Sequence, residues 1–281
     1  MTLKRRQSKA NFKNFFKIVK KPAAAHNVEP KKKPRRGIYL LPNAFTTAAL
    51  FCGFYAIVMG MDGYFEKATI AIFVAMVLDS LDGRVARMTN TQSEFGAQYD
   101  SLSDMVSFGA APALVAYEWA LRGLGQWGWL AAFVYCACAA LRLARFNTNI
   151  AVVDKNYFQG IPSPAAAALV AGFIWAMTNL EINAVSMRWV IWFITLMAGF
   201  TMVSNVPFYS FKELNLKKSV PFAVPLLLVL AYVLIVSFPS IVLFSVFIIY
   251  CLSGYAIFLW RWRKGRPVSI LQTKIEVHDD H

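Results

Sequence analysis

Long apolar segments recur along most of the chain and constrain its fold more than any other feature. A helix needs ~20 mostly apolar residues to cross the hydrocarbon core of a bilayer. About eight segments meet this requirement, and they run approximately over residues 39–61, 65–85, 96–121, 127–146, 162–180, 189–206, 220–238 and 241–260. The sequence therefore predicts an all-α, polytopic membrane helix bundle with about eight transmembrane helices.

Charged side chains are scarce but strongly biased toward the basic type. They make up 16% of the chain against 58% hydrophobic residues, and the formal net charge is +14. Much of the excess lies before Gly37, where Glu29 is the one acidic residue. We expect residues 1–37 to be a basic cytoplasmic arm, partly disordered or an interfacial helix, that binds anionic membrane lipid and not nucleic acid. Residues 38–264 are expected to form the transmembrane domain and residues 265–281 a cytoplasmic tail.

Basic residues also fall on alternate connections between the predicted spans. The connections after the even-numbered spans carry Arg84, Arg87, Arg142, Arg145, Lys155, Lys212, Lys217 and Lys218, whereas the opposite connections carry few charges. Basic residues accumulate on the cytoplasmic side of membrane proteins. We therefore expect a multi-pass protein of the inner (cytoplasmic) membrane, with both termini and the polar segment around Arg84 on the cytoplasmic side.

Cysteine and histidine offer little chemistry inside the membrane. The four cysteines all lie in apolar segments without a C-x-x-C pair, and the three histidines lie in the polar tails. The cysteines are therefore interpreted as small buried residues. Zinc sites and acid–base catalysis that depend on histidine are excluded from the membrane domain.

Four aspartates lie at the two ends of a short polar segment. Asp79 and Asp82 are three residues apart and Asp100 and Asp104 are four apart, so each pair occupies one face of a helix. Carboxylates at the edge of lipid are costly unless cations or reacting groups offset their charge. Because ligation by oxygen alone selects hard cations, the pattern predicts a site for Mg²⁺ or Mn²⁺, with Ca²⁺ as a further candidate.

Arg84 and Arg87 allow an alternative in which the aspartates only form salt bridges. Two local arginines would leave the repulsion among four carboxylates uncompensated, which disfavours this alternative. Gly83 and Ala86 leave one side of the same helix free for a bulky ligand, and the guanidinium of Arg87 suits phosphate oxygens. These features predict a nucleotide or pyrophosphate as ligand and phosphoryl transfer as the chemistry.

The same residues carry a resemblance to a known family. The chain resembles the CDP-alcohol phosphatidyltransferases, whose signature is D-x-x-D-G-x-x-A-R, eight residues, then G-x-x-x-D-x-x-x-D. Every fixed position of this pattern is filled, by Asp79, Asp82, Gly83, Ala86, Arg87, Gly96, Asp100 and Asp104. The resemblance implies a membrane enzyme in which the hydroxyl of a small alcohol displaces CMP from a CDP-linked lipid.

The resemblance also implies roles for individual residues. Asp79, Asp82 and Asp100 are expected to bind two divalent cations, and Asp104 to contact the second cation and act as the general base. The residues expected to contact the CDP-lipid are Asn43, Thr46, Gly83, Ala86, Arg87, Ser93 and Gly96. Ala49 departs from the pattern, since related enzymes often carry asparagine there, and this puts a peripheral contact in doubt.

Three further segments narrow the choice of acceptor alcohol. Residues 40–46, 142–147 and 157–164 are similar to those of the bacterial phosphatidylserine synthases within this family, which implies CDP-diacylglycerol and L-serine as substrates. Arg142 and Arg145 are candidates for binding the serine carboxylate, assisted by Asn147. An alternative also remains open, in which both arginines only mark the cytoplasmic side of the membrane or bind lipid headgroups.

Other functions remain as alternatives. The acceptor alcohol could instead be inositol phosphate, glycerol phosphate or choline. A cation-coupled secondary transporter would also use acidic residues in a membrane domain, but here the acids flank one cytoplasmic segment instead of following a path across the midplane. Faces rich in small residues, such as residues 165–168, permit close helix packing and make a homodimer an expectation.

Overall fold

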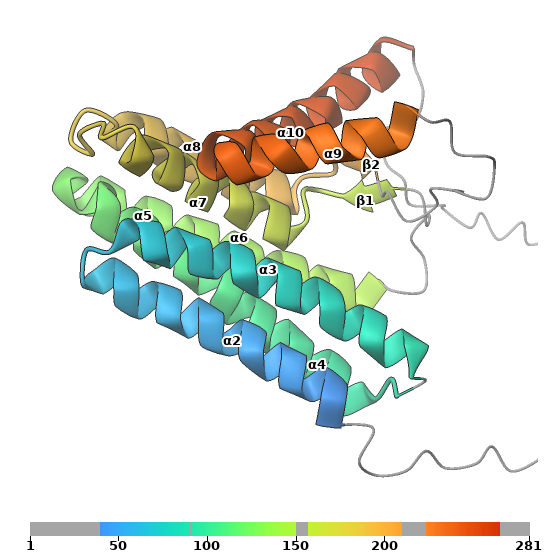
Figure 1. Ribbon diagram of the computed structural model, residues 1–281. Helices are drawn as coiled ribbons and strands as arrows, with labels where there is room; N and C mark the ends of the chain where they lie inside the picture. Colours follow the sequence, from blue (N-terminus) through green and yellow to red (C-terminus); the bar gives the residue numbers. More distant parts are fainter. Residues whose placement is uncertain (1–39, 90, 150–156, 210–222, 265–281) are drawn as a thin grey trace, which may run out of the picture. The chain divides into compact units, whose positions relative to one another are not determined.

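The computed structural model describes residues 40–89, 91–149, 157–209 and 223–264 (Figure 1), all within one compact unit. These segments are mostly helical. The helices are α2 (Leu40–Met61), α3 (Phe65–Met88), α4 (Glu94–Asp104), η1 (Met105–Ala110), α5 (Ala111–Trp119), η2 (Leu121–Leu124), α6 (Gln126–Asn149), α7 (Ser163–Asn179), α8 (Arg188–Val203), α9 (Ala223–Ser237) and α10 (Pro239–Arg263). The predicted arm and tail lie outside the described residues.

Each of the predicted spans coincides with helical structure, but the third is interrupted. It consists of α4, the π-helix η1 and α5 in direct succession. Among the described residues, three helices are long and apolar enough to cross a membrane, at Leu41–Met61, Gln126–Thr148 and Pro239–Arg261. Others are shorter, or carry charges at one end as α3 does. The helix bundle is thus present, while the number of eight transmembrane helices stays a prediction.

A small antiparallel sheet was not expected in an all-α protein. Strand β1 (Tyr157–Gln159) pairs with β2 (Pro207–Tyr209), with Phe158 opposite Phe208. Strands of three residues are too short for an alternating pattern to be detected in the sequence. Gly160 follows β1 at φ +73°, and a Cβ there would collide with the carbonyl oxygen of Met202. Gly160 is therefore packed directly against the end of α8, and the short sheet is a small addition to the helix bundle that was predicted.

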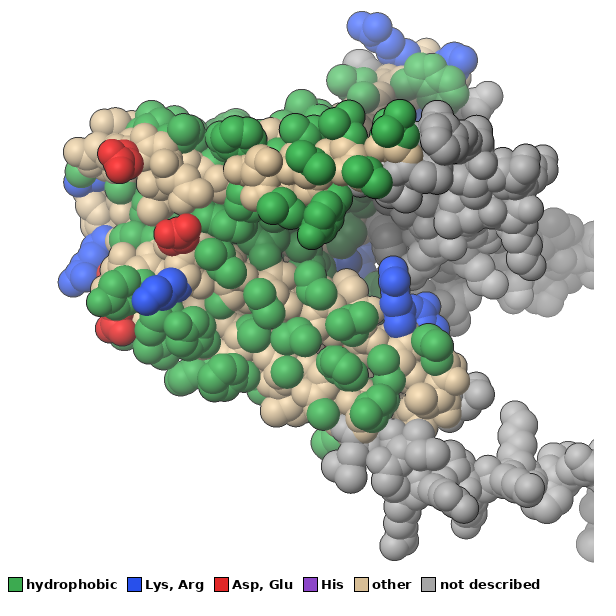
Figure 2. All heavy atoms as spheres, in the orientation of Figure 1, with side chains coloured by type: hydrophobic (Ala, Val, Ile, Leu, Met, Phe, Trp, Pro, Cys, Tyr) green, Lys and Arg blue, Asp and Glu red, His purple; other side chains and the backbone are tan. Residues whose placement is uncertain are grey.

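Helix α7 lies in the interior of the bundle. It packs against α3, α5, α8 and α10, and its small-residue run Ala165–Ala168 is almost fully buried. Small side chains let helix backbones approach closely where lipid offers no hydrophobic driving force for association. By contrast, the side chains of α9 described in the structure are mostly exposed. Figure 2 shows a surface dominated by hydrophobic side chains, with the charged ones towards its two ends, as expected of an integral membrane protein.

The packing brings the polar segments to one end of the bundle. Helices α2 and α3 run side by side, joined by a tight turn that includes Gly63 at φ +80°. The start of α2, the end of α3 and the whole of α4 therefore lie at the end opposite this turn (Figure 1). Polar groups that are separated along the chain thus form a cluster in space.

Candidate active site

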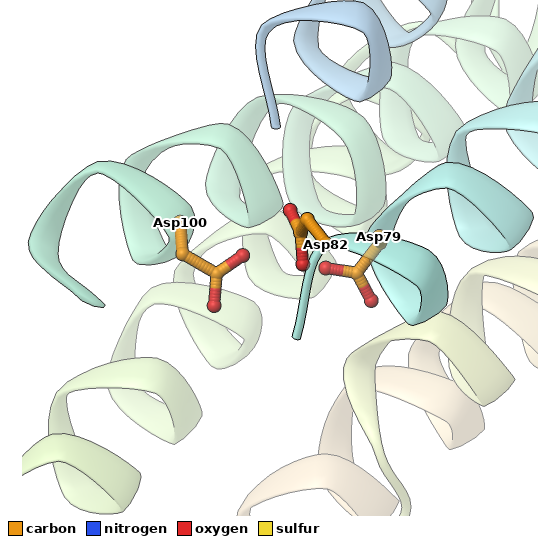
Figure 3. A group of neighbouring side chains, drawn as sticks. All are labelled: Asp79, Asp82 and Asp100. Atoms are coloured by element: carbon orange, nitrogen blue, oxygen red, sulfur yellow. The ribbon is translucent and has the colours of Figure 1, made fainter. Parts of the chain in front are cut away.

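Three of the predicted acids converge on one point. Asp79 and Asp82 lie on the last turns of α3 and Asp100 lies on α4, and their carboxylates point toward one another (Figure 3). One oxygen of each residue lies within 4.8 Å of the others. Oxygens of a single cation site lie at this kind of separation, because each is 2.0–2.6 Å from the ion. The two facing pairs predicted from residue spacing are therefore brought together.

Asp104 completes the group from one turn further along α4. Its carboxyl lies close to that of Asp79, and the charge of Arg142 acts on it. We term Asp79, Asp82, Asp100 and Asp104 the acidic cluster. Asp104 thus lies near the group of three oxygens but is not one of its members.

The acidic cluster has few compensating contacts within the described part of the chain. Asp82 is buried and accepts a hydrogen bond of 2.7 Å from Thr46 Oγ1. Asp100 Oδ1 is buried without a hydrogen-bond partner. No ion pair joins the cluster to Arg84 or Arg87 in the residues that the structure describes, so the salt-bridge alternative is not realised there. Unpaired carboxylates at this density fit hard divalent cations.

A cavity of about 450 Å³ opens beside the acidic cluster. It is lined by Pro42, Asn43, Thr46, Asp82, Gly83, Ala86, Arg87, Thr91, Gln92, Ser93, Gly96, Ala97, Asp100 and Phe146. We term it the signature cavity, because all seven residues predicted to contact a CDP-lipid lie on its wall. The prediction missed Pro42, Thr91, Gln92, Ala97 and Phe146. Thr91 and Gln92 belong to the polar segment between the two halves of the signature, which was the signal that could have identified them.

Two glycines on this wall have different surroundings. A Cβ at Gly96 would lie 3.0 Å from Ser93 Oγ, which caps α4 by accepting a hydrogen bond from the Gly96 N–H. A Cβ at Gly83 would meet no protein atom within 4 Å. The packing of the protein therefore does not require glycine at position 83, and the free space lies in the cavity itself. This space would accept a ligand that approaches the α3 backbone closely.

Arg87 lies at the mouth of the signature cavity. Its Nε donates a 2.9 Å hydrogen bond to the carbonyl oxygen of Gly83 one turn earlier. This contact leaves the two terminal nitrogens of the exposed guanidinium for a ligand. Guanidinium groups oriented in this way bind phosphate oxygens with two parallel hydrogen bonds.

The three residues predicted to bind serine are not all brought together. Arg142 donates a 2.7 Å hydrogen bond to Ser163 Oγ and keeps a buried Nε without a partner. Arg145 instead donates to the carbonyl oxygen of Val203 at 3.1 Å and to Asn205 Oδ1 at 2.7 Å.

The donors of Arg145 therefore tie the end of α6 to the end of α8. Asn147 Nδ2 donates to Ser101 Oγ at 3.0 Å, beside Asp100 on α4. Of the two arginines, Arg142 interacts electrostatically with Asp104, whereas the donors of Arg145 are used by Val203 and Asn205.

Comparisons with known proteins show the family of the chain. The model of the CDP-alcohol phosphatidyltransferase family matches residues 39–203. The chain is 38% identical over 187 residues to a CDP-diacylglycerol–serine O-phosphatidyltransferase of Helicobacter pylori, covering 66% of this chain and 78% of that protein. It is 31% identical over 247 residues to the protein of that name from Mycobacterium tuberculosis, covering 84% and 85%. The protein of that name from Saccharomyces cerevisiae is 40% identical over 141 residues, covering 45% and 50%.

Proposed function

The chain belongs to the CDP-alcohol phosphatidyltransferase family, and we propose that it transfers the phosphatidyl group of CDP-diacylglycerol to the hydroxyl of L-serine, releasing CMP. One observation carries the proposal: Arg87 lines the signature cavity together with Asp82 and Asp100, two of the three aspartates whose oxygens lie within 4.8 Å of one another. The names of the relatives support serine as the acceptor.

The acidic cluster is assigned to divalent cations, Mg²⁺ or Mn²⁺, with Asp79, Asp82, Asp100 and Asp104 as ligands of two ions. The fit rests on the oxygen-only donor set and on the buried Asp100 Oδ1 that has no partner in the described chain. Bound ions would neutralise charge on the pyrophosphate and on the departing CMP.

The signature cavity is assigned to the CDP part of the lipid substrate. Arg87 binds phosphate oxygens, and the bare backbone at Gly83 admits the pyrophosphate close to α3. Asn43, Thr46, Ala86, Ser93 and Gly96 line the remaining wall. Together these contacts would orient the lipid-side phosphorus toward Asp104, since the cavity borders the acidic cluster.

Asp104 is assigned as the general base and Arg142 as the group that binds the serine carboxylate. Asp104 takes the proton of the serine hydroxyl, the serine oxygen bonds to the lipid-side phosphorus, and the bond from that phosphorus to the CMP oxygen breaks. Arg142 suits this role because its charge acts on Asp104 and it has a buried donor, Nε, without a partner in the described chain. Arg145 and Asn147 would support this end of α6 through their contacts to Asn205 and Ser101.

The proposal is tested by measuring CMP release from CDP-diacylglycerol by the purified protein. We expect release to require serine and a divalent cation, and to stop when a chelator removes the cation. Labelled serine should appear in the lipid product, and an excess of inositol phosphate, glycerol phosphate or choline should not compete. Serine flux into proteoliposomes without CMP release would instead support the transporter and refute the enzyme.

Replacing Arg142 with lysine is expected to raise KM for serine about tenfold, because an ammonium cannot form the paired hydrogen bonds of a guanidinium with a carboxylate. KM for CDP-diacylglycerol should change little, since Arg142 does not line the signature cavity. The matched control is Arg145→Lys on the same helix, whose donors contact Val203 and Asn205. Equal effects of the two variants on KM for serine would contradict the assignment.

The remaining assignments concern location and partners. We propose that the protein lies in the inner (cytoplasmic) membrane with both termini and the acidic cluster on the cytoplasmic side, where serine is available. The distribution of basic residues along the sequence supports this orientation. A homodimer and contact of the basic arm with anionic lipid are part of the same proposal. The dimer interface would have to use a face other than Ala165–Ala168, which is buried within the bundle.

A further inference from the structure

The backbone changes helical form immediately after Asp104. Residues Met105–Ala110 form the π-helix η1, and the N–H of Ala111 donates to the carbonyl oxygen of Val106, five residues earlier. A π turn holds one more residue than an α turn, and π turns in proteins are often found at functional sites. One residue corresponds to about 100° of rotation around a helix. The extra residue therefore sets how Asp104 is oriented relative to α5, which follows η1.

Two buried hydroxyl groups connect this π turn to its neighbouring helices α2 and α6. Ser107 Oγ, on the turn itself, donates to the carbonyl oxygen of Ala49 on α2 at 3.1 Å. Tyr135 Oη, on α6, donates to the carbonyl oxygen of Phe108 at 3.0 Å. Ser107, Tyr135 and Phe108 all have 0% exposure. Both hydrogen bonds are thus shielded from water, which makes their loss costly for the turn.

The contact with α2 is unusually close. A Cβ at Gly53 would lie 2.5 Å from Ser107 Oγ and 2.7 Å from Ser107 Cα, so only glycine fits opposite this serine. One turn before Ser107, Ser103 Oγ donates to the carbonyl oxygen of Thr46 at 3.1 Å. The hydroxyl of the same Thr46 donates to Asp82 in the acidic cluster. Helix α2 therefore fixes the register of the turn and contacts the cluster directly.

We propose that Ser107 and Tyr135 are positioning residues, which hold the π turn so that Asp104 faces Asp79 and the acidic cluster binds its cations. Without these hydrogen bonds the turn can relax to α geometry, and Asp104 then turns away from Asp79. The two residues act through main-chain atoms of α2 and η1 and contact no reacting group. The inference rests on the proposed function only in taking the cluster as a cation site.

The test uses binding of Mn²⁺ to the purified full-length protein in detergent, without either substrate, followed by the paramagnetic signal of free Mn²⁺. Ser107→Ala and Tyr135→Phe each remove one oxygen and no carbon atom. We expect each to weaken Mn²⁺ binding about tenfold, the effect of removing groups that orient metal ligands. The controls are Ser245→Ala, whose hydroxyl bonds the carbonyl of Ile241 within its own helix, and Tyr117→Phe on α5.

Ser107→Cys, which keeps a weaker donor, should lie between wild type and Ser107→Ala in Mn²⁺ affinity. The thermal unfolding midpoint of each variant, measured in the presence of a chelator, reports separately on the stability of its fold. Wild-type Mn²⁺ affinity in both Ser107→Ala and Tyr135→Phe would overturn the proposal, and so would a lowered midpoint with unchanged affinity. If the wild-type protein binds Mn²⁺ but releases no CMP with serine, the proposed function fails while this test still decides the role of the π turn.

Discussion

Replacing Asp79 with asparagine is expected to lower serine-dependent CMP release by about 10²–10³-fold, the loss of several kcal/mol of charge stabilisation by the metal. Asp79 contributes to the group of oxygens within 4.8 Å and also contacts Asp104. The amide has the same shape as the carboxyl, so the packing of α3 is preserved. The substitution removes one negative charge and gives the cation a weaker ligand.

The expected mechanism can be checked by varying the cation concentration. If Asp79 is a ligand, Mn²⁺ binding to the variant should weaken, and part of the lost activity should return at high Mn²⁺. The matched control is Asp62→Asn, at an exposed aspartate in the turn between α2 and α3. Normal cation affinity in Asp79→Asn, with activity close to wild type, would remove Asp79 from the metal site.

The sequence predicted the acidic cluster because the signal is local. One helix carries two aspartates three residues apart, and the next carries two that are four residues apart. Each pair lies on one face of its helix, so the cluster forms once the two faces pack against each other. The structure brings these two faces together. Residues on the wall of the signature cavity, such as Arg87 and Ser93, were predicted from the resemblance to the family. The spans were predicted for the same reason, since apolar length is visible in any window of ~20 residues.

Contacts between distant segments were not predicted in the same way. Arg142 and Arg145 look equivalent in the sequence, one turn apart, yet one donates to Ser163 and the other to Asn205. Nothing near either arginine in the sequence encodes that difference, because the partners come from other helices. The π turn at Met105–Ala110 was also missed, since the apolar pattern continues through it and its extra residue shows only in the backbone hydrogen bonds.

The four aspartates are expected to have different roles, depending on whether they belong to the group of three converging oxygens. Asp79, Asp82 and Asp100 meet within 4.8 Å, whereas Asp104 is outside this group and interacts with both Asp79 and Arg142. A carboxylate near both the cation ligands and the group assigned to serine is well placed to take a proton from the serine hydroxyl. Loss of Asp104 should therefore affect turnover more than cation affinity, the reverse of the balance expected for Asp79.

Asp104→Asn is accordingly expected to lower kcat by about 10²–10⁴-fold, the usual contribution of a general base. KM for CDP-diacylglycerol should stay close to wild type, because Asp104 does not line the signature cavity. Mn²⁺ binding should weaken by at least the tenfold expected when the π turn loses a hydrogen bond, but less than in Asp79→Asn, since three carboxylates remain at one point. Asp104→Glu keeps a carboxylate on a longer side chain and should recover part of the turnover. Near wild-type turnover of Asp104→Asn at neutral pH would exclude Asp104 as the base, because its amide cannot accept the proton.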